Sequence, residues 1–272
     1  MEQGNLLILL FIVGLGVGGL GSMLGIGGGV LLIPLLTGLF DISIKTAIGA
    51  SIICVIATSS AAGAIYVGRG LVHTRLAMIL EIATTMGALA GGITAVLLSP
   101  NMLSGIFGTA LIYVLFSLRR LPKEDLAVVP TGVLNTTYID PFSDQVLTYG
   151  IRNLPLGMGA SFVAGNISGL LGIGGGIIKV PVMSLIMGMP LRAAIATSNF
   201  MIGITAATSA VIYYQHGYLD PSIAIPTALG VLLGAQLGTR IGGRVRSQRL
   251  KQIFQGLLLV FAIQMFYQAV VG

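Results

Sequence analysis

The chain contains the stretch GIGGGVLLIP at residues 25–34, and a near copy, GIGGGIIKVP, occupies residues 172–181. The similarity extends past the glycines with a constant offset of 147 residues: Ala47-Ile48 recurs as Ala194-Ile195, Ile65-Tyr66 as Ile212-Tyr213, and Gly87-Ala88 as Gly234-Ala235. The alignment needs no gap over more than sixty residues. The chain therefore consists of two copies of one unit, and each copy carries a glycine-rich break at the same place.

The composition predicts a membrane protein. Charged residues make up 8% of the chain and hydrophobic residues 55%, with a mean hydropathy of +1.00, whereas soluble domains carry about 25% charged residues. Apolar runs of about 20 residues are long enough to cross a hydrocarbon core about 30 Å thick. Backbone in that core must be satisfied within helices or a closed barrel, and unbroken runs favour helices. We predict an all-α integral membrane protein.

Ten apolar segments can be placed, five in each copy. They lie at residues 5–23, 29–40, 46–67, 75–98, 102–118, 154–171, 176–188, 193–214, 221–243 and 251–271. The second and seventh are too short to cross alone at about 1.5 Å per residue. The sequence leaves open whether they span fully or form re-entrant hairpins. Each holds a proline, Pro34 or Pro181, which we expect in the first turn of a half-helix.

The segments predict three regions: an N-terminal transmembrane repeat (1–118), a cytoplasmic linker (119–153) and a C-terminal transmembrane repeat (154–272). The linker is the longest polar segment. Residues 133–149 within it are either a small hairpin or part of a solvated connection, and the sequence leaves both open.

Cation placement predicts the orientation. If the chain starts outside and crosses ten times, one cation, Lys45, falls outside and twelve fall inside: Arg69, Arg75, Arg119, Arg120, Lys123, Arg152, Arg192, Arg240, Arg244, Arg246, Arg249 and Lys251. This asymmetry follows the positive-inside rule and places both termini outside. Because five crossings per copy is an odd number, the two copies are expected to be inverted repeats, a common design of secondary transporters.

The glycine breaks predict an anion site. Glycine accepts positive φ and lets backbones approach closely, and broken backbone inside a bilayer persists only where protein or a wet cavity satisfies it. The helix that follows begins with free N–H groups and the positive end of its dipole, which together bind anions. The alternative is that the glycines only allow tight helix crossings. The candidate substrate-binding glycines are Gly25, Gly27, Gly28, Gly29, Gly172, Gly174, Gly175 and Gly176.

Polar residues near the breaks complete the candidate site. Lys179 replaces Leu32 of the first copy; a lysine so deep in an apolar segment either adds charge for an anionic substrate or is paired internally. Ser51, Ser198 and Asn199 are candidates to donate hydrogen bonds to an oxyanion, or to join helices. Glu81, which replaces Ala228 of the second copy, is a candidate coupling residue for a proton, with pairing to Arg75 as the alternative.

Other classes of function lack their residues. The net charge of +6 does not indicate a nucleic-acid partner, because the cations lie at segment ends rather than in one patch. Cys54 is the single cysteine, so no internal disulfide or CxxC motif exists. Neither a Ser-His-Asp set nor a phosphate-binding loop is present, so we expect no enzyme and no cofactor. His73 and His216 are assigned no metal.

These motifs resemble the sulfite exporter TauE/SafE family. The resemblance rests on the two glycine-proline stretches and on Ala196-Thr197-Ser198, about fifteen residues after the second, and it covers residues 6–270. It implies a plasma-membrane transporter of small sulfur-containing anions such as sulfite, sulfonates or thiosulfate, often in export. Two positions depart from the family pattern. The first copy has Gly49-Ala50-Ser51 in place of Ala-Thr-Ser, and Lys179 stands where the family often has an apolar residue.

The expected function is a secondary transporter, acting as an exporter of small sulfur-containing anions by alternating access. The alternatives are an anion channel, which would need continuous polar faces that these segments lack, and an importer of another small oxyanion or carboxylate. The expected partners are the small anion and the lipid bilayer, with a proton or a sodium ion as the candidate coupling ion. The sequence leaves open the exact substrate, the direction of transport and whether the protein is a homo-oligomer.

Overall fold

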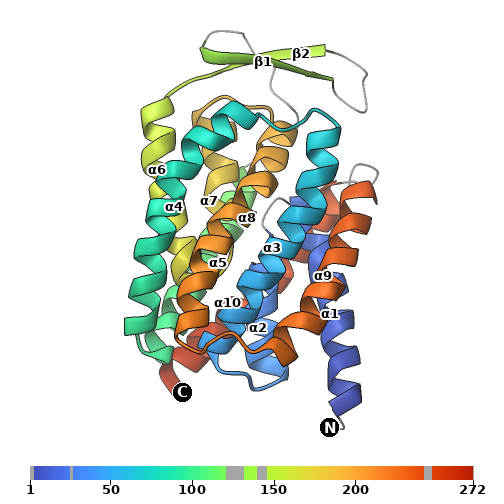
Figure 1. The fold of residues 1–272 in the computed structure, drawn as a ribbon, viewed down its shortest axis with the longest axis vertical. Coiled ribbons are helices and arrows are strands. Elements are labelled where there is room, and N and C mark those ends of the chain that lie inside the picture. The colour runs from blue at the N-terminus through green and yellow to red at the C-terminus, as the bar shows by residue number, and fades with distance from the viewer. Residues whose placement is uncertain (1–2, 25–26, 121–131, 140–145, 242–246, 272) are drawn as a thin grey trace.

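The computed structural model describes residues 3–24, 27–120, 132–139, 146–241 and 247–271, and it shows a helical bundle with one small β-hairpin at its end (Figure 1). The elements are α1 (Gln3–Leu24), α2 (Gly29–Leu39), α3 (Ile44–Gly68), α4 (Thr74–Leu97), α5 (Pro100–Arg120), β1 (Val133–Ile139), β2 (Val146–Ile151), α6 (Leu154–Leu171), α7 (Gly176–Pro181), the π-helix η1 (Val182–Ile186), α8 (Leu191–Gln215), α9 (Pro221–Ile241) and α10 (Ser247–Val271). Within the described residues, eight helices are long and apolar enough to cross a membrane. The predicted all-α membrane class is confirmed.

The two short helical segments follow the glycine breaks, as predicted, but their prolines lie elsewhere than expected. Pro34 is inside α2, at its sixth residue rather than in its first turn, and Pro181 is the last residue of α7. The expectation of first-turn prolines is therefore wrong. Proline lacks an N–H and its ring displaces the carbonyl four residues back, so a helix must adjust around it. After Pro181 the backbone adjusts by widening into the π-helical turn of η1.

The contacts between helices repeat when each element is exchanged for its counterpart in the other copy. Helix α1 packs against α9, and α6 packs against α4; α2 contacts α10, and α7 contacts α5. The counterparts α3 and α8 pack against each other, and so do α5 and α10. A pseudo-two-fold relation between the copies has this property. Figure 1 shows α1 beginning at the end that holds both termini and α6 beginning beside the hairpin, so these counterparts run in opposite directions.

Glycines set the register of the paired helices in both copies. A Cβ added to Gly87 of α4 would meet the carbonyl oxygen of Phe162 in α6, and one added to Gly234 of α9 would meet the carbonyl oxygen of Leu15 in α1. Both the glycines and their contacts are related by the offset of 147 residues. Small residues allow such close approach between membrane helices, so the repeated sequence specifies a repeated packing.

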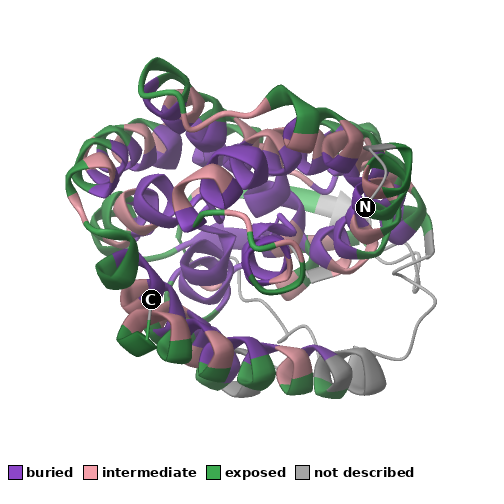
Figure 2. Cartoon of the chain, turned by 90° about the horizontal axis from the view of Figure 1, so that it is seen from below, coloured by how far each residue is buried: buried purple, intermediate pink, exposed green. Residues whose placement is uncertain are grey.

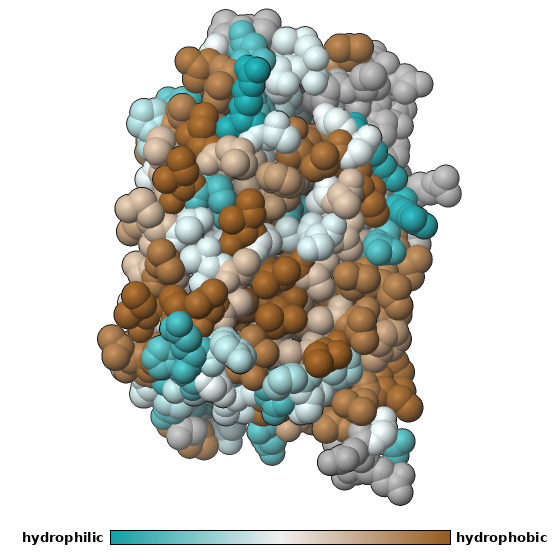
Figure 3. Space-filling model, viewed as in Figure 1, coloured by the Kyte–Doolittle hydropathy of each residue, from teal (hydrophilic) through white to brown (hydrophobic). Residues whose placement is uncertain are grey.

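The outer surface of the bundle is apolar and its centre is buried. Figure 2 shows buried residues in the middle of the bundle and exposed residues on its rim. Large apolar side chains face outward on several helices, among them Ile82 (66% exposed), Ile225 (58%) and Ile263 (64%). On the face shown in Figure 3 apolar side chains cover the middle, and polar ones gather toward the two ends. Exposing such a surface to water would cost about 25 cal/mol per Å², so a lipid bilayer is its natural solvent.

The segment between the copies contains an antiparallel hairpin, β1 paired with β2, so the hairpin alternative for residues 133–149 is confirmed. Its second strand also packs onto the bundle, because Tyr149 and Ile151 are buried. The Nε2 atom of His73, at the start of α4, lies 2.9 Å from the carbonyl oxygen of Leu134. The hairpin is thus attached to the bundle at the start of α4 rather than being fully solvated.

Candidate functional site

The two glycine breaks contact each other inside the bundle. The Ser51 Oγ atom on α3 donates a 2.8 Å hydrogen bond to the carbonyl oxygen of Gly172. A Cβ placed on Gly29, at the start of α2, would lie 2.7 Å from that same oxygen. The start of α2 in the first copy therefore lies directly against the break of the second copy. Of the predicted site glycines, Gly25 lies outside the described residues.

The breaks have the same backbone conformation at equivalent positions. Gly27 and Gly174 have φ values of 80° and 78°, and Gly28 and Gly175 have values of 77° and 70°. This left-handed region strongly favours glycine. Helices α2 and α7 begin at the next residue, and no side chain caps either N-terminus. The first N–H groups of each helix therefore have no partner within the helix and no capping side chain.

Two apolar side chains lie beside both breaks, next to Gly27 and Gly174. Val55 of α3 and Ile202 of α8 occupy equivalent positions of the two copies. Each lies within reach of a Cβ built on either Gly27 or Gly174. The two breaks therefore face the same pair of side chains, one from each copy.

Asn199 joins helices with one end of its amide and leaves the other end open. Its Nδ2 atom donates to the carbonyl oxygens of Ile195, at 3.1 Å, and Ser22, at 3.4 Å. Its Oδ1 atom is buried and has no hydrogen-bond partner among the described residues. Ser59 of α3 donates to the Asn199 carbonyl oxygen at 2.5 Å. The structure thus shows the helix-joining role of this residue, and its open oxygen is an acceptor that cannot donate a hydrogen bond to an oxyanion. Ser198, beside it, is fully buried.

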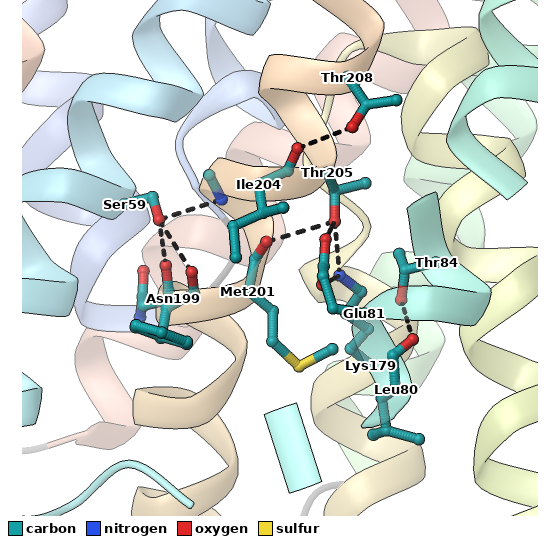
Figure 4. Close-up of polar contacts among 12 residues, drawn as sticks. Ser59, Leu80, Glu81, Thr84, Lys179, Asn199, Met201, Ile204, Thr205 and Thr208 are labelled. Carbon is teal, nitrogen blue, oxygen red and sulfur yellow. Dashed lines mark hydrogen bonds and ion pairs between the residues drawn. The ribbon is translucent and has the colours of Figure 1, made fainter. Parts of the chain in front are cut away.

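Lys179 and Glu81 form a buried ion pair between the two copies (Figure 4). The Lys179 Nζ atom on α7 lies 3.5 Å from the Glu81 Oε2 atom on α4, and the two residues are 2% and 5% exposed. Thr205 of α8 joins them: Lys179 donates to the Thr205 Oγ1 atom at 3.0 Å, and that hydroxyl donates to the Glu81 Oε1 atom at 2.6 Å. Lys179 thus has the internal partner that its burial requires.

The identity of that partner corrects one alternative and adds one residue. The sequence offers Arg75 as an ion-pair partner of Glu81. In the structure Arg75 is exposed near the start of α4, and Glu81 pairs with Lys179 instead. Thr205 is a site residue that sequence reasoning misses. A signal for it exists, because Thr58 occupies the equivalent position of the first copy, and the Thr58 hydroxyl lies 3.3 Å from the carbonyl oxygen of Gly27.

The fold and site define a multi-pass membrane transporter built from a duplicated unit with two broken helices. Comparison with known proteins gives the same class and a family. The pattern of the family described as sulfite exporter TauE/SafE matches residues 10–265, which is nearly the whole chain. The protein belongs to this family.

Relatives with curated descriptions carry the same general name. A probable membrane transporter protein, YunE of Bacillus subtilis (strain 168), is 28% identical over 271 residues, which cover 97% of this chain and 98% of the relative. The probable membrane transporter protein MJ0441 of Methanocaldococcus jannaschii is 27% identical over 242 residues, covering 84% and 83%. One from Xylella fastidiosa (strain 9a5c) is 28% identical over 226 residues, 80% of each chain. No solved structure matches the chain.

Proposed function

We propose that this protein is a secondary transporter that exports small sulfur-containing anions, such as sulfite, sulfonates or thiosulfate, across the cell membrane. The observation that carries the proposal is the contact between the uncapped start of α2, at Gly29, and the second glycine break, at Gly172, inside a duplicated bundle. Helix N-termini and left-handed glycine turns bind anions through backbone N–H groups and the helix dipole. The family's description as a sulfite exporter supports the substrate class and the direction.

The site assigned to the anion combines backbone and side-chain donors from both copies. The breaks contribute Gly27, Gly28 and Gly29 from one copy and Gly172, Gly174, Gly175 and Gly176 from the other, with Gly25 completing the first motif. Ser51, Ser198 and Asn199 are the proposed side-chain donors, and Lys179 contributes the positive charge. The Ser51 hydroxyl and the Asn199 amide nitrogen now donate to backbone carbonyl oxygens, so binding of the anion requires that they release these partners. Oxyanions of sulfur are small, so a few donors at the junction of two breaks are enough to replace their hydration shell.

We propose alternating access as the mechanism, with the copies acting as inverted repeats. The opposite directions of α1 and α6 and the exchange symmetry of the helix contacts support this design. In such transporters the site stays near the midplane, and one repeat moves against the other to open it to either side.

Flux and binding measurements test this function together. Purified protein in liposomes is expected to exchange external for internal labelled thiosulfate or sulfite, a counterflow that an open channel does not perform. A ligand that binds only the folded protein stabilises it by about 2.7 kcal/mol at a hundred times its Kd. We therefore expect sulfite, thiosulfate or methanesulfonate to raise the melting temperature more than acetate or chloride does. Absence of both counterflow and selective stabilisation would contradict the proposal.

The proposed orientation, with both termini outside and the hairpin in the cytoplasm, predicts cysteine accessibility. In a background with Cys54→Ala, Thr148→Cys on the hairpin should react with an impermeant maleimide only after cells are opened. Asn101→Cys, at the start of α5 and the opposite end of the bundle, should react in intact cells; both positions are exposed. The reverse labelling pattern would show that the protein is inserted the other way.

A further inference from the structure

The ion pair between Glu81 and Lys179 joins the first copy to the second at the start of a half-helix. Lys179 lies in the first turn of α7, since its backbone N–H donates to the carbonyl oxygen of Gly175 at 3.1 Å. Its backbone therefore belongs to the break that the proposed function assigns to the substrate anion, while its ammonium group lies between Thr205 of α8 and Glu81 of α4. In this structure the ammonium group is paired with the carboxylate of Glu81. An anionic substrate that uses Lys179 must replace this carboxylate.

Replacement leaves Glu81 with an unpaired charge unless it takes up a proton. Its Oε2 atom is buried and has no hydrogen-bond partner among the described residues, although the ammonium lies 3.5 Å away. Removing one member of a buried ion pair leaves an uncompensated charge at high cost in free energy. A substrate anion on Lys179 together with an ionised Glu81 would place two negative charges beside one positive charge inside the bilayer.

Thr205 provides a route for the change in protonation. Its hydroxyl now donates to the Glu81 Oε1 atom at 2.6 Å and accepts from Lys179 at 3.0 Å. The carbonyl oxygen of Met201, 3.3 Å from the same hydroxyl, is an alternative acceptor. A protonated Glu81 can therefore donate to Thr205, which turns its own proton to Met201. Glu81 keeps a hydrogen bond in both states, and Lys179 becomes free to bind an anion.

We propose that the Glu81 carboxylate occupies the place of the substrate beside Lys179 in the empty site. When an oxyanion binds to Lys179 instead, Glu81 moves away with one proton bound, so that each transported anion moves with one proton. The charges balance: the empty site holds an ionised Glu81 and Lys179, and the loaded site holds a neutral Glu81, Lys179 and a monovalent anion. The proton comes from the solution to which the site is open and returns to the solution on the side of release. This inference rests on the proposed function and assigns its coupling ion.

No other charged group on α4, α6, α7, η1 or α8 competes for this role. Helix α6 and η1 carry no ionisable side chain, and Lys179 is the one ionisable residue of α7. The remaining ionisable groups of α4 and α8, with the residue that caps α4, lie about 9–20 Å away along their helices at 1.5 Å per residue: His73, Arg75, Arg192, Tyr213 and Tyr214. Glu81 and Lys179 therefore respond to each other and to the ligand.

Methanesulfonate is a suitable probe because it is the anion of a strong acid and carries no proton of its own. Liposomes containing the full-length protein and an internal pH dye are loaded with buffer, clamped at zero potential, and given labelled methanesulfonate outside. We expect the interior to acidify with one proton for each anion that enters, and we expect an acidic exterior to drive accumulation.

Glu81→Gln separates coupling from binding, because glutamine resembles the protonated acid in shape and charge. This variant should keep the exchange of internal for external methanesulfonate and lose both proton movement and accumulation driven by a pH gradient. Thr84→Val is the matched control on α4, since the Thr84 hydroxyl bonds only the Leu80 carbonyl oxygen of its own helix, at 2.8 Å. It should behave as the wild type in all three measurements.

The outcomes distinguish this inference from the proposed function. Wild-type protein that moves methanesulfonate without protons would overturn the inference alone. A Glu81→Gln variant that loses exchange and accumulation in parallel, with a lower melting temperature, would show a purely structural ion pair and would also overturn it. Wild-type protein that moves neither probe nor sulfite would overturn the proposed function and this inference with it.

Discussion

Gly175→Leu and Gly28→Leu are each expected to abolish anion transport while leaving a protein that inserts into the membrane. Both glycines have left-handed backbone, with φ values of 70° and 77°. A Cβ at position 175 would lie 2.8 Å from the Ala164 carbonyl oxygen, and one at position 28 would lie 3.2 Å from the Val17 Cγ1 atom. Strained backbone costs about 1–3 kcal/mol at each such residue, and about 1.4 kcal/mol is tenfold. Counterflow of labelled thiosulfate in liposomes, per inserted molecule, should fall by about a hundredfold.

Gly159→Leu is the control for these substitutions. Gly159 lies on α6, before the second break; it is exposed and a Cβ there would meet nothing within 4 Å. Its counterpart in the first copy is Ile12, a large side chain that faces outward. This variant should transport normally. If Gly28→Leu and Gly175→Leu fold and exchange thiosulfate at the rate of the control, the breaks are not the anion site.

The broken helices can be predicted from the sequence because the relevant physics is local. A run of glycines followed by a short apolar segment is too flexible to remain helical and too short to cross a bilayer afterwards. The duplication also makes part of the helix packing predictable, because equivalent glycines such as Gly87 and Gly234 make equivalent helix contacts in the two copies. The adjustment at Pro181 is different: whether a helix bends, stops or widens there depends on its neighbours, and the widening into η1 is not encoded in the residue pattern.

The polar contacts of the candidate site are only partly predictable. The burial of Lys179 follows from its place in an apolar half-helix, but its partner Glu81 is almost a hundred residues earlier in the chain. No spacing rule relates two residues in different copies, so Arg75, close to Glu81 on the same helix, is the nearer candidate until the fold is known. Thr205 is one of many hydroxyl residues in apolar segments, and only its match to Thr58 singles it out.

Symmetry between the copies is broken at the residues that carry charge. At the positions of Glu81 and Lys179 the opposite copies have Ala228 and Leu32. A symmetric transporter would bring two such pairs into one membrane core, where each buried charge is costly. In the proposed transporter, one pair is enough to set a charge at the site and to exchange it for a substrate. The proposed site therefore takes backbone donors from both copies and its charge from the one ion pair, Glu81 with Lys179, that the described residues form between them.

Lys179→Met is expected to lower both the stability of the protein and its affinity for anions, for two different reasons. Methionine keeps the length of the side chain but leaves Glu81, which is 5% exposed, without its partner. Breaking a buried ion pair costs about 3–5 kcal/mol, so the melting temperature should fall clearly. Losing a hydrogen bond to a charged partner costs about 1.5–3 kcal/mol, which corresponds to roughly a ten- to hundredfold weaker affinity for methanesulfonate or thiosulfate.

The double variant Lys179→Met/Glu81→Gln separates these effects. It removes the orphaned carboxylate, because a neutral amide can accept the hydrogen bond of Thr205 that now reaches the Glu81 Oε1 atom, so most of the lost stability should return. Anion affinity should remain low, because the ammonium is still absent. Lys179→Arg keeps the charge with a different geometry and should retain part of the affinity. Melting temperature and binding are measured on the same preparations. Recovery of affinity along with stability in the double variant, or unchanged affinity in Lys179→Met, would show that Lys179 serves the fold and not the substrate.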